Sequence, residues 1–496
     1  MDRRSGVQSS ERRFAAYVEH LAQALGHADR VAPLKAYCTG LILPGERKSV
    51  EPMAARLEPT RVQAAHQSLH HFVAKADWSD EALLALVRAW VLPEMERHGP
   101  IRAWVVDDTG FPKKGRHSVG VTRQYCGQIG KQDNCQVAVT LSVASLHASL
   151  PIAYRLYLPE LWAEDRERRA KAGVPEGVAF RTKPEIALDQ IRSALAAGVS
   201  PGVVLADAGY GVDTAFRTAL TDLGLTYSLG IQSSTTLWPP GQAPLPPKPW
   251  SGRGRPPTRV RRNPNHAPLS AKDLARALPS EAWQSIQWRE GTNAPLVSRF
   301  AAVRVRPAHR DHLLHEPRPE EWFLVEWPDG EQEPTKYWLS TLPPDTAMAD
   351  LVEQAKLRWR VERDYQELKQ EIGLGHYEGR GWRGFHHHAT LCIAAYGFLV
   401  SERSQIPPSS PPAEIVQTPH LPDGYRPRGA SHQAGAPRAG LHHDPAHPPG
   451  QRSCHAAPTM SLLPSRTHDT VVLSVWMRDL LGGSDHEESF GQDARI

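Results

Sequence analysis

Two short apolar runs, each followed by an aspartate, constrain the fold of this chain most strongly. Trp104-Val105-Val106 precedes Asp107, and Val203-Val204-Leu205-Ala206 precedes Asp207. Short runs of β-branched, aliphatic and aromatic residues are typical of buried strands. In open α/β sheets, sites form beyond the carboxyl ends of the strands. We therefore expect both aspartates to lie at strand ends on one edge of a sheet.

The residues next to these aspartates refine the expectation. Successive strand residues point to opposite faces, so Asp107 and Asp108 cannot both approach one ion from a regular strand. One of the two is a candidate ligand, and the other is a candidate cap of the next turn. Asp207 is followed by Ala208-Gly209-Tyr210-Gly211, whose small residues allow a substrate to come close.

A third acid, Glu362, lies in a strongly helical stretch from Ala355 to Ile372. Helical spacing places Arg358, Glu362 and Lys369 on a stripe beside an apolar stripe, whose members are Leu357, Val361, Tyr365, Leu368 and Ile372. Glu362 is either a metal ligand whose cationic neighbours meet phosphates, or one partner of an ordinary i,i+4 ion pair. Carboxylates suit Mg²⁺ or Mn²⁺, and two such ions about 4 Å apart can act on a phosphodiester.

The order of the other segments predicts an α/β core. Apolar periodicity predicts helices from residue 11 to 95, then strands at 102–107, 118–125 and 135–146, followed by a polar connection. Further along, it predicts a helix at 184–197, a strand at 203–207, a helix at 213–223 and a strand at 226–231. Strand-like segments within 283–342, a helix at 347–372 and a buried helix at 389–400 complete the pattern.

Charge and cysteine content narrow the class of protein. The formal net charge of +4 decides little, but residues 251–262 carry five arginines and no acid. That segment is either a phosphate-binding loop or a solvated arginine-rich loop. The five cysteines include no CxxC pair, which argues against a disulfide framework or zinc knuckle and fits a reducing cytosol. The N-terminus has no apolar core of a signal peptide, and residues 389–400 are too few to span a bilayer.

A run of three histidines, His386-His387-His388, has the composition of a metal cluster. Adjacent helical residues point in different directions, so the three cannot all bind one ion. We expect no zinc site here and expect His388 to pack or to contact DNA.

Residues 104–145, 180–188, 204–211 and 358–380 resemble bacterial insertion-sequence transposases of the DDE superfamily, and the resemblance runs from about Tyr37 to Arg403. It implies an α/β, RNase H-like mixed sheet flanked by helices, with an N-terminal helical domain and a β-rich insertion before the glutamate helix. It makes Asp107, Asp207 and Glu362 the catalytic, metal-binding triad for two Mg²⁺ (or Mn²⁺) ions. Arg358 and Lys369 take signature positions that contact DNA phosphates. The signature tyrosine falls on Ala355, so that contact is absent or supplied elsewhere.

The resemblance also implies an activity. We expect metal-dependent cleavage of double-stranded DNA at the ends of an insertion sequence, followed by attack of the freed 3′-hydroxyl on target DNA. Lys113, Lys114, Arg123 and Lys131 either hold phosphate near the first strand or are solvated loop cations. A homodimer on DNA and a location in the bacterial cytoplasm, at the nucleoid, follow from the family. The alternatives are a DNA-binding protein without catalysis and a nuclease of the same fold that joins no strands.

Five segments follow from these patterns. They are a helical, possibly DNA-binding domain at 1–100, the first part of the catalytic core at 101–231, the β-rich insertion with a basic, proline-rich loop at 232–345, the second part of the core with the glutamate helix at 346–403, and a Pro/His-rich tail at 404–496. The tail has too few large apolar residues to form a core, so it is either a linker or a stretch whose reading frame has drifted.

Overall fold

The computed structural model describes residues 9–289 and 295–405, which belong to one compact unit. Its N-terminal part is helical, as predicted, with helices α1 Ser10–Ala22, α2 Val31–Ile42, α3 Val50–Leu57, α4 Val62–Ala74 and α5 Asp80–Glu96. The Ser79 hydroxyl caps α5 by accepting a hydrogen bond from the Ala82 N–H at 3.1 Å. In α1, Phe14, Val18 and Leu21 are buried on one face. The predicted tail from residue 406 onward lies outside the described residues.

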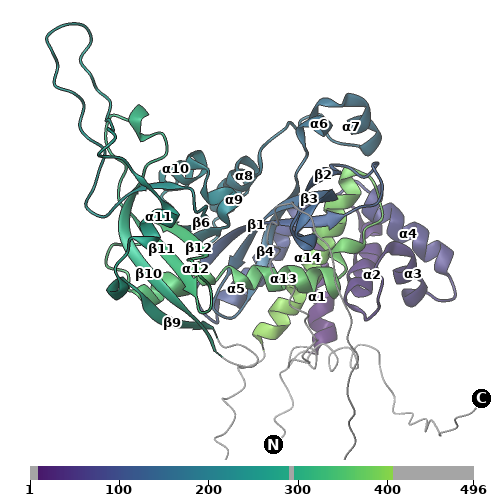
Figure 1. Cartoon of the computed structure of the whole chain (residues 1–496). Coiled ribbons are helices and arrows are strands. Elements are labelled where there is room, and N and C mark those ends of the chain that lie inside the picture. Colours follow the sequence, from purple (N-terminus) through teal and green to yellow (C-terminus); the bar gives the residue numbers. More distant parts are fainter. Residues whose placement is uncertain (1–8, 290–294, 406–496) are drawn as a thin grey trace, which may run out of the picture. The chain divides into compact units, whose positions relative to one another are not determined.

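The first part of the sheet contains β1 Ala103–Pro112, β2 Thr122–Cys126, β3 Lys131–Ala144, β4 Ser149–Leu156, β5 Val203–Ala206 and β6 Tyr227–Ile231. The strand order is β2-β3-β1-β5-β6, and β4 pairs with β3. β5 is parallel to both β1 and β6, whereas β3 is antiparallel to β1, β2 and β4. This mixed sheet with flanking helices is the RNase H-like core that the sequence predicted (Figure 1).

Helices connect these strands: α6 Glu160–Glu164, α7 Arg166–Ala172, α8 Lys183–Ala196, α9 Ala208–Gly211 and α10 Thr214–Asp222. A capping box of Thr182 and Glu185 begins α8, because each side chain satisfies the other residue's backbone N–H. The buried Gln190 amide then donates to the Val139 carbonyl at 3.0 Å, which fixes α8 against β3. The predicted helices at 184–197 and 213–223 are confirmed.

Three strand predictions were inaccurate. β1 continues to Pro112, because β3 pairs with it over its whole length, from Ala103↔Ala144 to Pro112↔Cys135. Asp107 therefore lies within a strand and not at its end, whereas Asp207 does follow the end of β5. β2 begins at Thr122, later than predicted, and β3 begins at Lys131, earlier than predicted. The segment interpreted as a polar connection contains β4, whose Leu150, Ile152 and Leu156 are buried.

The β-rich insertion continues the same sheet. It contains β7 Thr236–Trp238, β8 Leu269–Ser270, α11 Ala271–Arg276, β9 Gln284–Arg289, β10 Leu296–Pro307, β11 Glu321–Pro328 and β12 Lys336–Ser340. β12 is antiparallel to β6, from Tyr337↔Ile231 to Ser340↔Ser228, and the order proceeds β12-β11-β10-β7-β8. All of β6 is buried, since β5 and β12 pair with its two edges and helices α9 and α12 pack against it.

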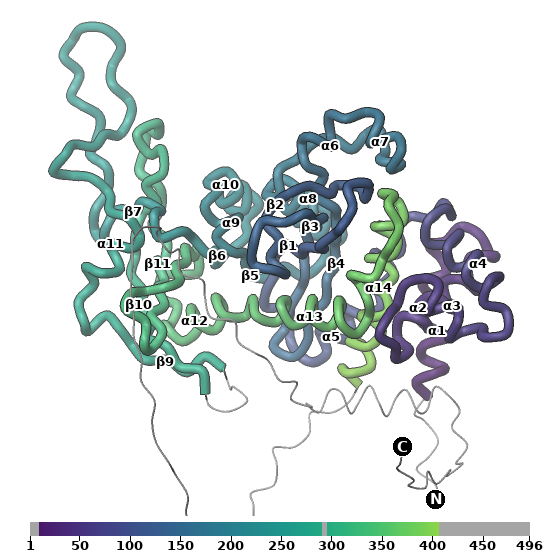
Figure 2. Tube along the Cα trace, turned by 45° about the vertical axis from the view of Figure 1, so that its right-hand side comes forward, coloured from purple at the N-terminus to yellow at the C-terminus, as the bar shows by residue number. Residues whose placement is uncertain are grey.

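Three helices follow the insertion: α12 Met348–Lys356, α13 Trp359–Gln370 and α14 Trp382–Ser404. The prediction of one helix at 347–372 was wrong, because the helix breaks between Lys356 and Trp359. The prediction of a buried helix at 389–400 is confirmed: α14 is buried along most of its length. It packs against β4 on one side and against α2 and α4 on another (Figure 2), and the Tyr17 hydroxyl donates to its Ala394 carbonyl at 2.9 Å.

Membrane-spanning helices and the state of the cysteines can be described for these residues alone. Within residues 9–289 and 295–405, no helix combines the length and the apolar character needed to cross a bilayer. The cysteines of this part, Cys38, Cys126, Cys135 and Cys392, are buried free thiols.

Candidate active site

Strand register places Asp107 beside Asp207. The parallel pairing of β1 with β5 sets Ala103 opposite Val203 and Val105 opposite Leu205. Continuing this register by two residues sets Asp107 alongside Asp207 and on the same face. Asp207 caps α9, since its Oδ1 accepts a hydrogen bond from the Gly209 N–H at 2.8 Å. Sequence and sheet pairing thus bring together two acids that are far apart along the chain.

Asp107 is a largely buried carboxylate, with 14% of its side chain exposed. Burial raises its pKa to about 6, and the negative charges of Asp207 and Asp108 act in the same direction. The Arg358 guanidinium and the Asp108 backbone N–H, which donates to Asp107 Oδ1 at 2.9 Å, lower the pKa but do not offset burial. A buried carboxylate with a perturbed pKa in a polar cluster is typical of a functional site.

Arg358 connects the third acid to this pair. It is the N-cap residue of α13, and its Nη1 donates to Asp107 Oδ2 at 3.0 Å while its Nη2 donates to Glu362 Oε1 at 2.9 Å. Burial lowers the pKa of Arg358, but the charges of Asp107, Glu362 and Asp207 together raise it by more, so the pKa lies above its ordinary value. All three predicted acids therefore act on one guanidinium. The i,i+4 ion pair considered for Glu362 is present, and it lies beside Asp107.

The donor set fits a divalent cation in chemistry. Asp107, Asp207 and Glu362 supply the carboxylate oxygens that Mg²⁺ and Mn²⁺ prefer. In the part of the chain that the structure describes, no three His, Cys, Asp or Glu side chains are close enough to hold one ion. Arg358 takes the place of a cation between Asp107 and Glu362, and Glu362 has 60% of its side chain exposed.

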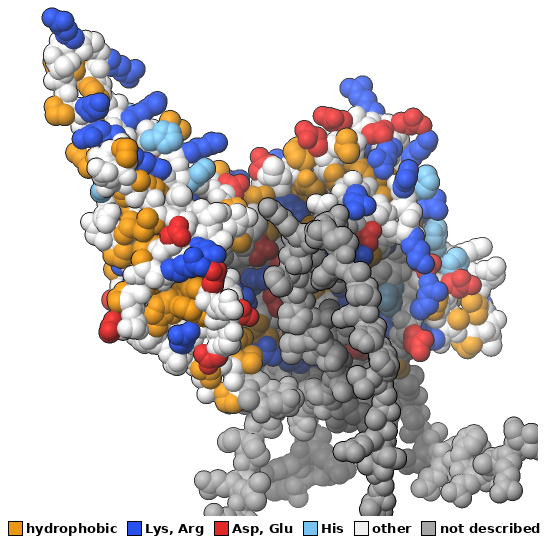
Figure 3. All heavy atoms as spheres, in the orientation of Figure 1, with side chains coloured by type: hydrophobic (Ala, Val, Ile, Leu, Met, Phe, Trp, Pro, Cys, Tyr) orange, Lys and Arg blue, Asp and Glu red, His pale blue; other side chains and the backbone are white. Residues whose placement is uncertain are grey.

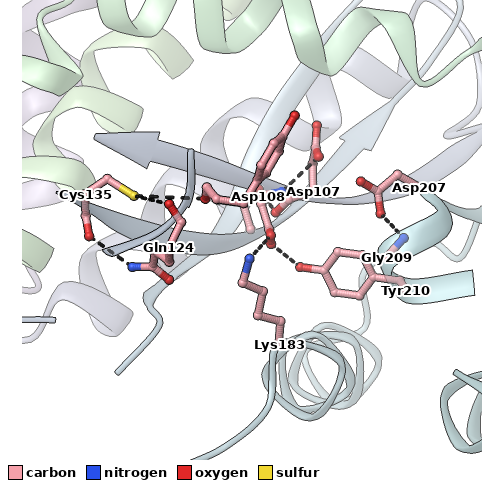
Figure 4. A network of polar contacts seen from close by, with 10 residues as sticks. Asp107, Asp108, Gln124, Cys135, Lys183, Asp207, Gly209 and Tyr210 are labelled. Atoms are coloured by element: carbon pink, nitrogen blue, oxygen red, sulfur yellow. Dashed lines mark hydrogen bonds and ion pairs between the residues drawn. The ribbon is translucent and has the colours of Figure 1, made fainter. Parts of the chain in front are cut away.

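The opposite face of β1 carries a second polar cluster, which the sequence did not predict (Figure 4). Asp108 accepts hydrogen bonds from Lys183 Nζ and from the Tyr210 hydroxyl. The proposed alternative that Asp108 caps a turn was wrong, since β1 continues past it. Lys183 begins α8, and Tyr210 lies in α9, the helix that Asp207 caps. Asp108 thus ties two helices to β1 beside the acids. Both partners lie within segments that carry the family resemblance, which was the available signal.

The predicted basic residues divide into two groups. Lys369 Nζ donates to the Gly110 carbonyl of β1 at 3.0 Å and lies over the Phe111 ring, and Lys113 Nζ donates to the Tyr377 carbonyl at 3.0 Å. Burial lowers the pKa of both lysines. The others, Lys114, Arg123 and Lys131, are exposed, and their side chains form no hydrogen bond or ion pair with another described residue. Only the second group is free to meet a ligand without breaking a contact.

Two further predictions concern residues near the site. Ala355 is buried in a cluster with Leu351 and Val352 of α12, so position 355 faces the core. The three histidines of α14 are buried, and each ring has its own hydrogen-bond partners. His388, for example, lies between the Tyr37 hydroxyl, 2.9 Å from its Nδ1, and the Gly373 carbonyl, 3.0 Å from its Nε2. Packing of His388 is therefore confirmed.

Two comparisons with known proteins show the family of this chain. A family model described as "DDE superfamily endonuclease" matches residues 20–295, which include Asp107 and Asp207 and end before Glu362. The chain is also 36% identical over 321 residues to a protein of Microchaete diplosiphon described as "Probable transposase for insertion sequence element IS701", covering 63% of this chain and 69% of that protein. The chain therefore belongs to the DDE superfamily of endonucleases, among its insertion-sequence transposases.

Proposed function

We propose that this chain cuts DNA at the ends of an insertion sequence and joins those ends to target DNA, with Asp107, Asp207 and Glu362 as its catalytic residues. The observation that carries the proposal is that Arg358 contacts both Asp107 and Glu362, while the nearby charge of Asp207 acts to raise the pKa of the same guanidinium. In DNA hydrolysis such a cluster suits two Mg²⁺ or Mn²⁺ ions, which would activate water and stabilise the leaving oxygen.

The two proposed steps balance without a further reactant. In the first, a water oxygen forms a bond to phosphorus, the bond from phosphorus to the 3′-oxygen breaks, and that oxygen takes up a proton. In the second, the freed 3′-hydroxyl attacks a target phosphodiester, so one phosphorus–oxygen bond replaces another and a target 3′-hydroxyl leaves. Asp107 and Asp207, fixed by β1 and by the N-terminus of α9, would hold the metal ions, which would keep the reacting phosphate in one place.

The basic residues and the segments have proposed roles as well. Exposed Lys114, Arg123 and Lys131 contact DNA phosphates, while Arg358, Lys369 and Lys113 exchange their present protein contacts for DNA when it binds. Residues 101–231 and 346–403 are the two parts of the catalytic core, 1–100 is a helical domain that binds DNA, and 232–345 is the insertion. We further propose double-stranded DNA as the partner, a homodimer on two DNA ends, and the bacterial cytoplasm as the location.

A cleavage assay tests the triad. Asp107→Asn, Asp207→Asn and Glu362→Gln keep side-chain size and remove charge, so each is expected to abolish nicking of the element's terminal sequence with Mg²⁺ or Mn²⁺. Glu353→Gln is the matched control, because Glu353 lies on the surface of α12, where it pairs with Arg102 and not with the triad. Wild-type cleavage by any of the three triad variants would show that the residue assignment is wrong.

The same preparation separates the alternatives. Strand-transfer products with a labelled target duplex support a transposase, whereas nicked DNA without joined products indicates a nuclease of the same fold. A gel shift on terminal DNA without cleavage under either metal indicates a DNA-binding protein that has lost its chemistry.

A further inference from the structure

The insertion carries a long basic segment that the proposed chemistry does not use. Residues 239–268, here called the arm, connect β7 to β8. From Gly241 to Ser270 the chain contains no aspartate or glutamate but one lysine and five arginines. Blue side chains line the projection at the upper left of the molecule's described part (Figure 3). A surface of this kind attracts a polyanion.

The structure divides the five arginines of the arm. Arg262 is structural, because its guanidinium donates to Asp311 Oδ1 at 2.8 Å through Nε and also pairs through Nη2. Arg261 is also structural: its backbone forms two 2.9 Å hydrogen bonds with Leu245, and its Nε donates to the Pro246 carbonyl at 3.0 Å. Arg253, Arg255 and Arg259 are exposed and form no hydrogen bond or ion pair with another described residue. The base of the arm is therefore fixed, and its tip presents free guanidinium groups.

The tip has a sequence with a specific shape. Arg253-Gly254-Arg255 is followed by Pro256-Pro257. Gly254 has a φ of +74°, a conformation that residues other than glycine rarely adopt, so the tip turns at this residue in the free protein; a Cβ added there would meet no atom within 4 Å. Once DNA draws this segment out along a groove, residues i and i+2 of the extended chain lie on one side, about 6.6 Å apart. Two base-pair steps of DNA span about 6.8 Å. The two arginines can thus follow one groove while glycine lets the backbone approach its floor.

The groove that fits such a tip is the narrow one. The DNA minor groove is about 6 Å wide, too narrow for a helix but wide enough for an extended chain without a central side chain. A·T tracts narrow it further and deepen its negative potential, which favours inserted arginine. The guanine N2 amino group projects into the floor of G·C pairs, whereas A·T pairs present acceptors only. The two prolines keep the following chain extended.

We propose that the tip of the arm inserts Arg253 and Arg255 into the minor groove of A·T-rich duplex DNA. Arg259, outside the Arg-Gly-Arg segment, contacts the phosphate backbone. This activity requires neither the carboxylate triad nor a divalent ion, so it stands independently of the proposed cleavage chemistry. It gives the protein a preference for A·T-rich segments of the DNA that it binds.

Fluorescence anisotropy of the full chain with labelled duplexes of one length, in the presence of EDTA, tests the proposal. The duplexes carry a central tract of A·T, G·C or inosine·cytosine pairs. Inosine·cytosine resembles G·C in the major groove but lacks the guanine N2 amino group in the minor groove. We expect the protein to bind the A·T and inosine·cytosine tracts roughly tenfold more tightly than the G·C tract. The reason is that the guanine N2 amino group of G·C pairs keeps both arginines from the floor of the minor groove.

Variants assign this preference to the tip. Arg253→Lys with Arg255→Lys keeps the charge but loses the weakly hydrated guanidinium groups, so binding should persist while the preference disappears. Arg259→Ala is the matched control and should weaken binding to all three tracts by the same factor. Equal affinity of the wild type for A·T and G·C, inosine·cytosine binding as weak as G·C, or a preference that survives Arg253→Ala with Arg255→Ala would each overturn the proposal.

Discussion

Arg358 is the residue on which the electrostatics of the site depend. It donates to the buried Asp107 and the more exposed Glu362, and it occupies the position between carboxylates that a cation would take. A guanidinium and a divalent ion attract the same oxygens, so the two compete for Asp107. The free protein therefore holds its acids together through an internal cation, which must give way when a metal ion enters.

Replacing Arg358 with methionine tests this competition. Asp107 loses its charged partner, so the free energy of unfolding without metal should fall by about 1–3 kcal/mol, less than for a fully buried pair because Arg358 is partly exposed. Mn²⁺ should bind the variant more tightly than the wild type, as measured by calorimetry without DNA. Arg363→Met on the same helix is the control, since Arg363 pairs with Glu367. Unchanged or weaker Mn²⁺ binding by the Arg358 variant would contradict the competition.

At the residue scale the sequence predicted faces but not partners. Strand alternation correctly separated Asp107 from Asp108, because the side-chain period of a strand is fixed by its backbone. The partners of Asp108 could not be derived in this way. Lys183 and Tyr210 reach it from α8 and α9, and no local pattern reports which helix end will pack beside a given strand.

At the element scale, the break between α12 and α13 had no signal in the sequence. Residues 355–372 contain the apolar spacing of one helix and no proline, and the first glycine is Gly373. At the break the backbone hydrogen bonds span three residues in place of the helical four, from Arg360 N to the Leu357 carbonyl and from Val361 N to the Arg358 carbonyl, both at 3.2 Å. The break leaves Ala355 in the core with α12 and puts Arg358 at the start of α13, where it meets Asp107.

The buried helix α14 gives the fold a dependence on acid pH. His388 is satisfied as a neutral ring, with its Nδ1 beside the Tyr37 hydroxyl and its Nε2 beside the Gly373 carbonyl. Burial lowers the pKa of His388 to about 4, and the nearby His376 and Lys113 charges add to this effect. A histidine in the unfolded chain has a pKa of about 6.5. The unfolded state therefore binds protons first as the pH falls, and stability is lost from about pH 6.5 down to pH 4.

His388→Gln should remove one titrating group from this dependence. Its free energy of unfolding should fall less steeply than that of the wild type between pH 6.5 and 4, where His388 alone accounts for up to roughly 3 kcal/mol. Urea unfolding at several pH values measures the slope. His70→Gln is the control, because His70 is exposed on α4. Equal slopes for wild type and the His388 variant would mean that His388 does not titrate in this range.

At the scale of the whole described unit, the sequence predicted the α/β core and the presence of an insertion but not how the insertion is attached. Insertions are usually tolerated at exposed loops, where they leave the host fold unchanged. In this protein β12 pairs with β6, so the insertion extends the sheet that carries Asp107. The two strands lie more than a hundred residues apart along the chain, and sheet pairing over that distance leaves no local pattern.

This attachment predicts that the insertion cannot be removed while its arm tip can. Deleting residues 236–340 exposes the backbone edge of β6 and strips α12 of its packing against Phe300, Leu324 and Trp338, so we expect a loss of cooperative thermal unfolding. Residues 249–257 lie beyond the Leu245–Arg261 hydrogen bonds that fix the base of the arm. Replacing them with a short glycine–serine link should therefore leave the melting temperature unchanged. Calorimetry and limited proteolysis of both variants measure the difference. A deletion variant that melts cooperatively at the wild-type temperature would show that the core does not depend on the β6–β12 pairing, and the insertion would then be an independent domain.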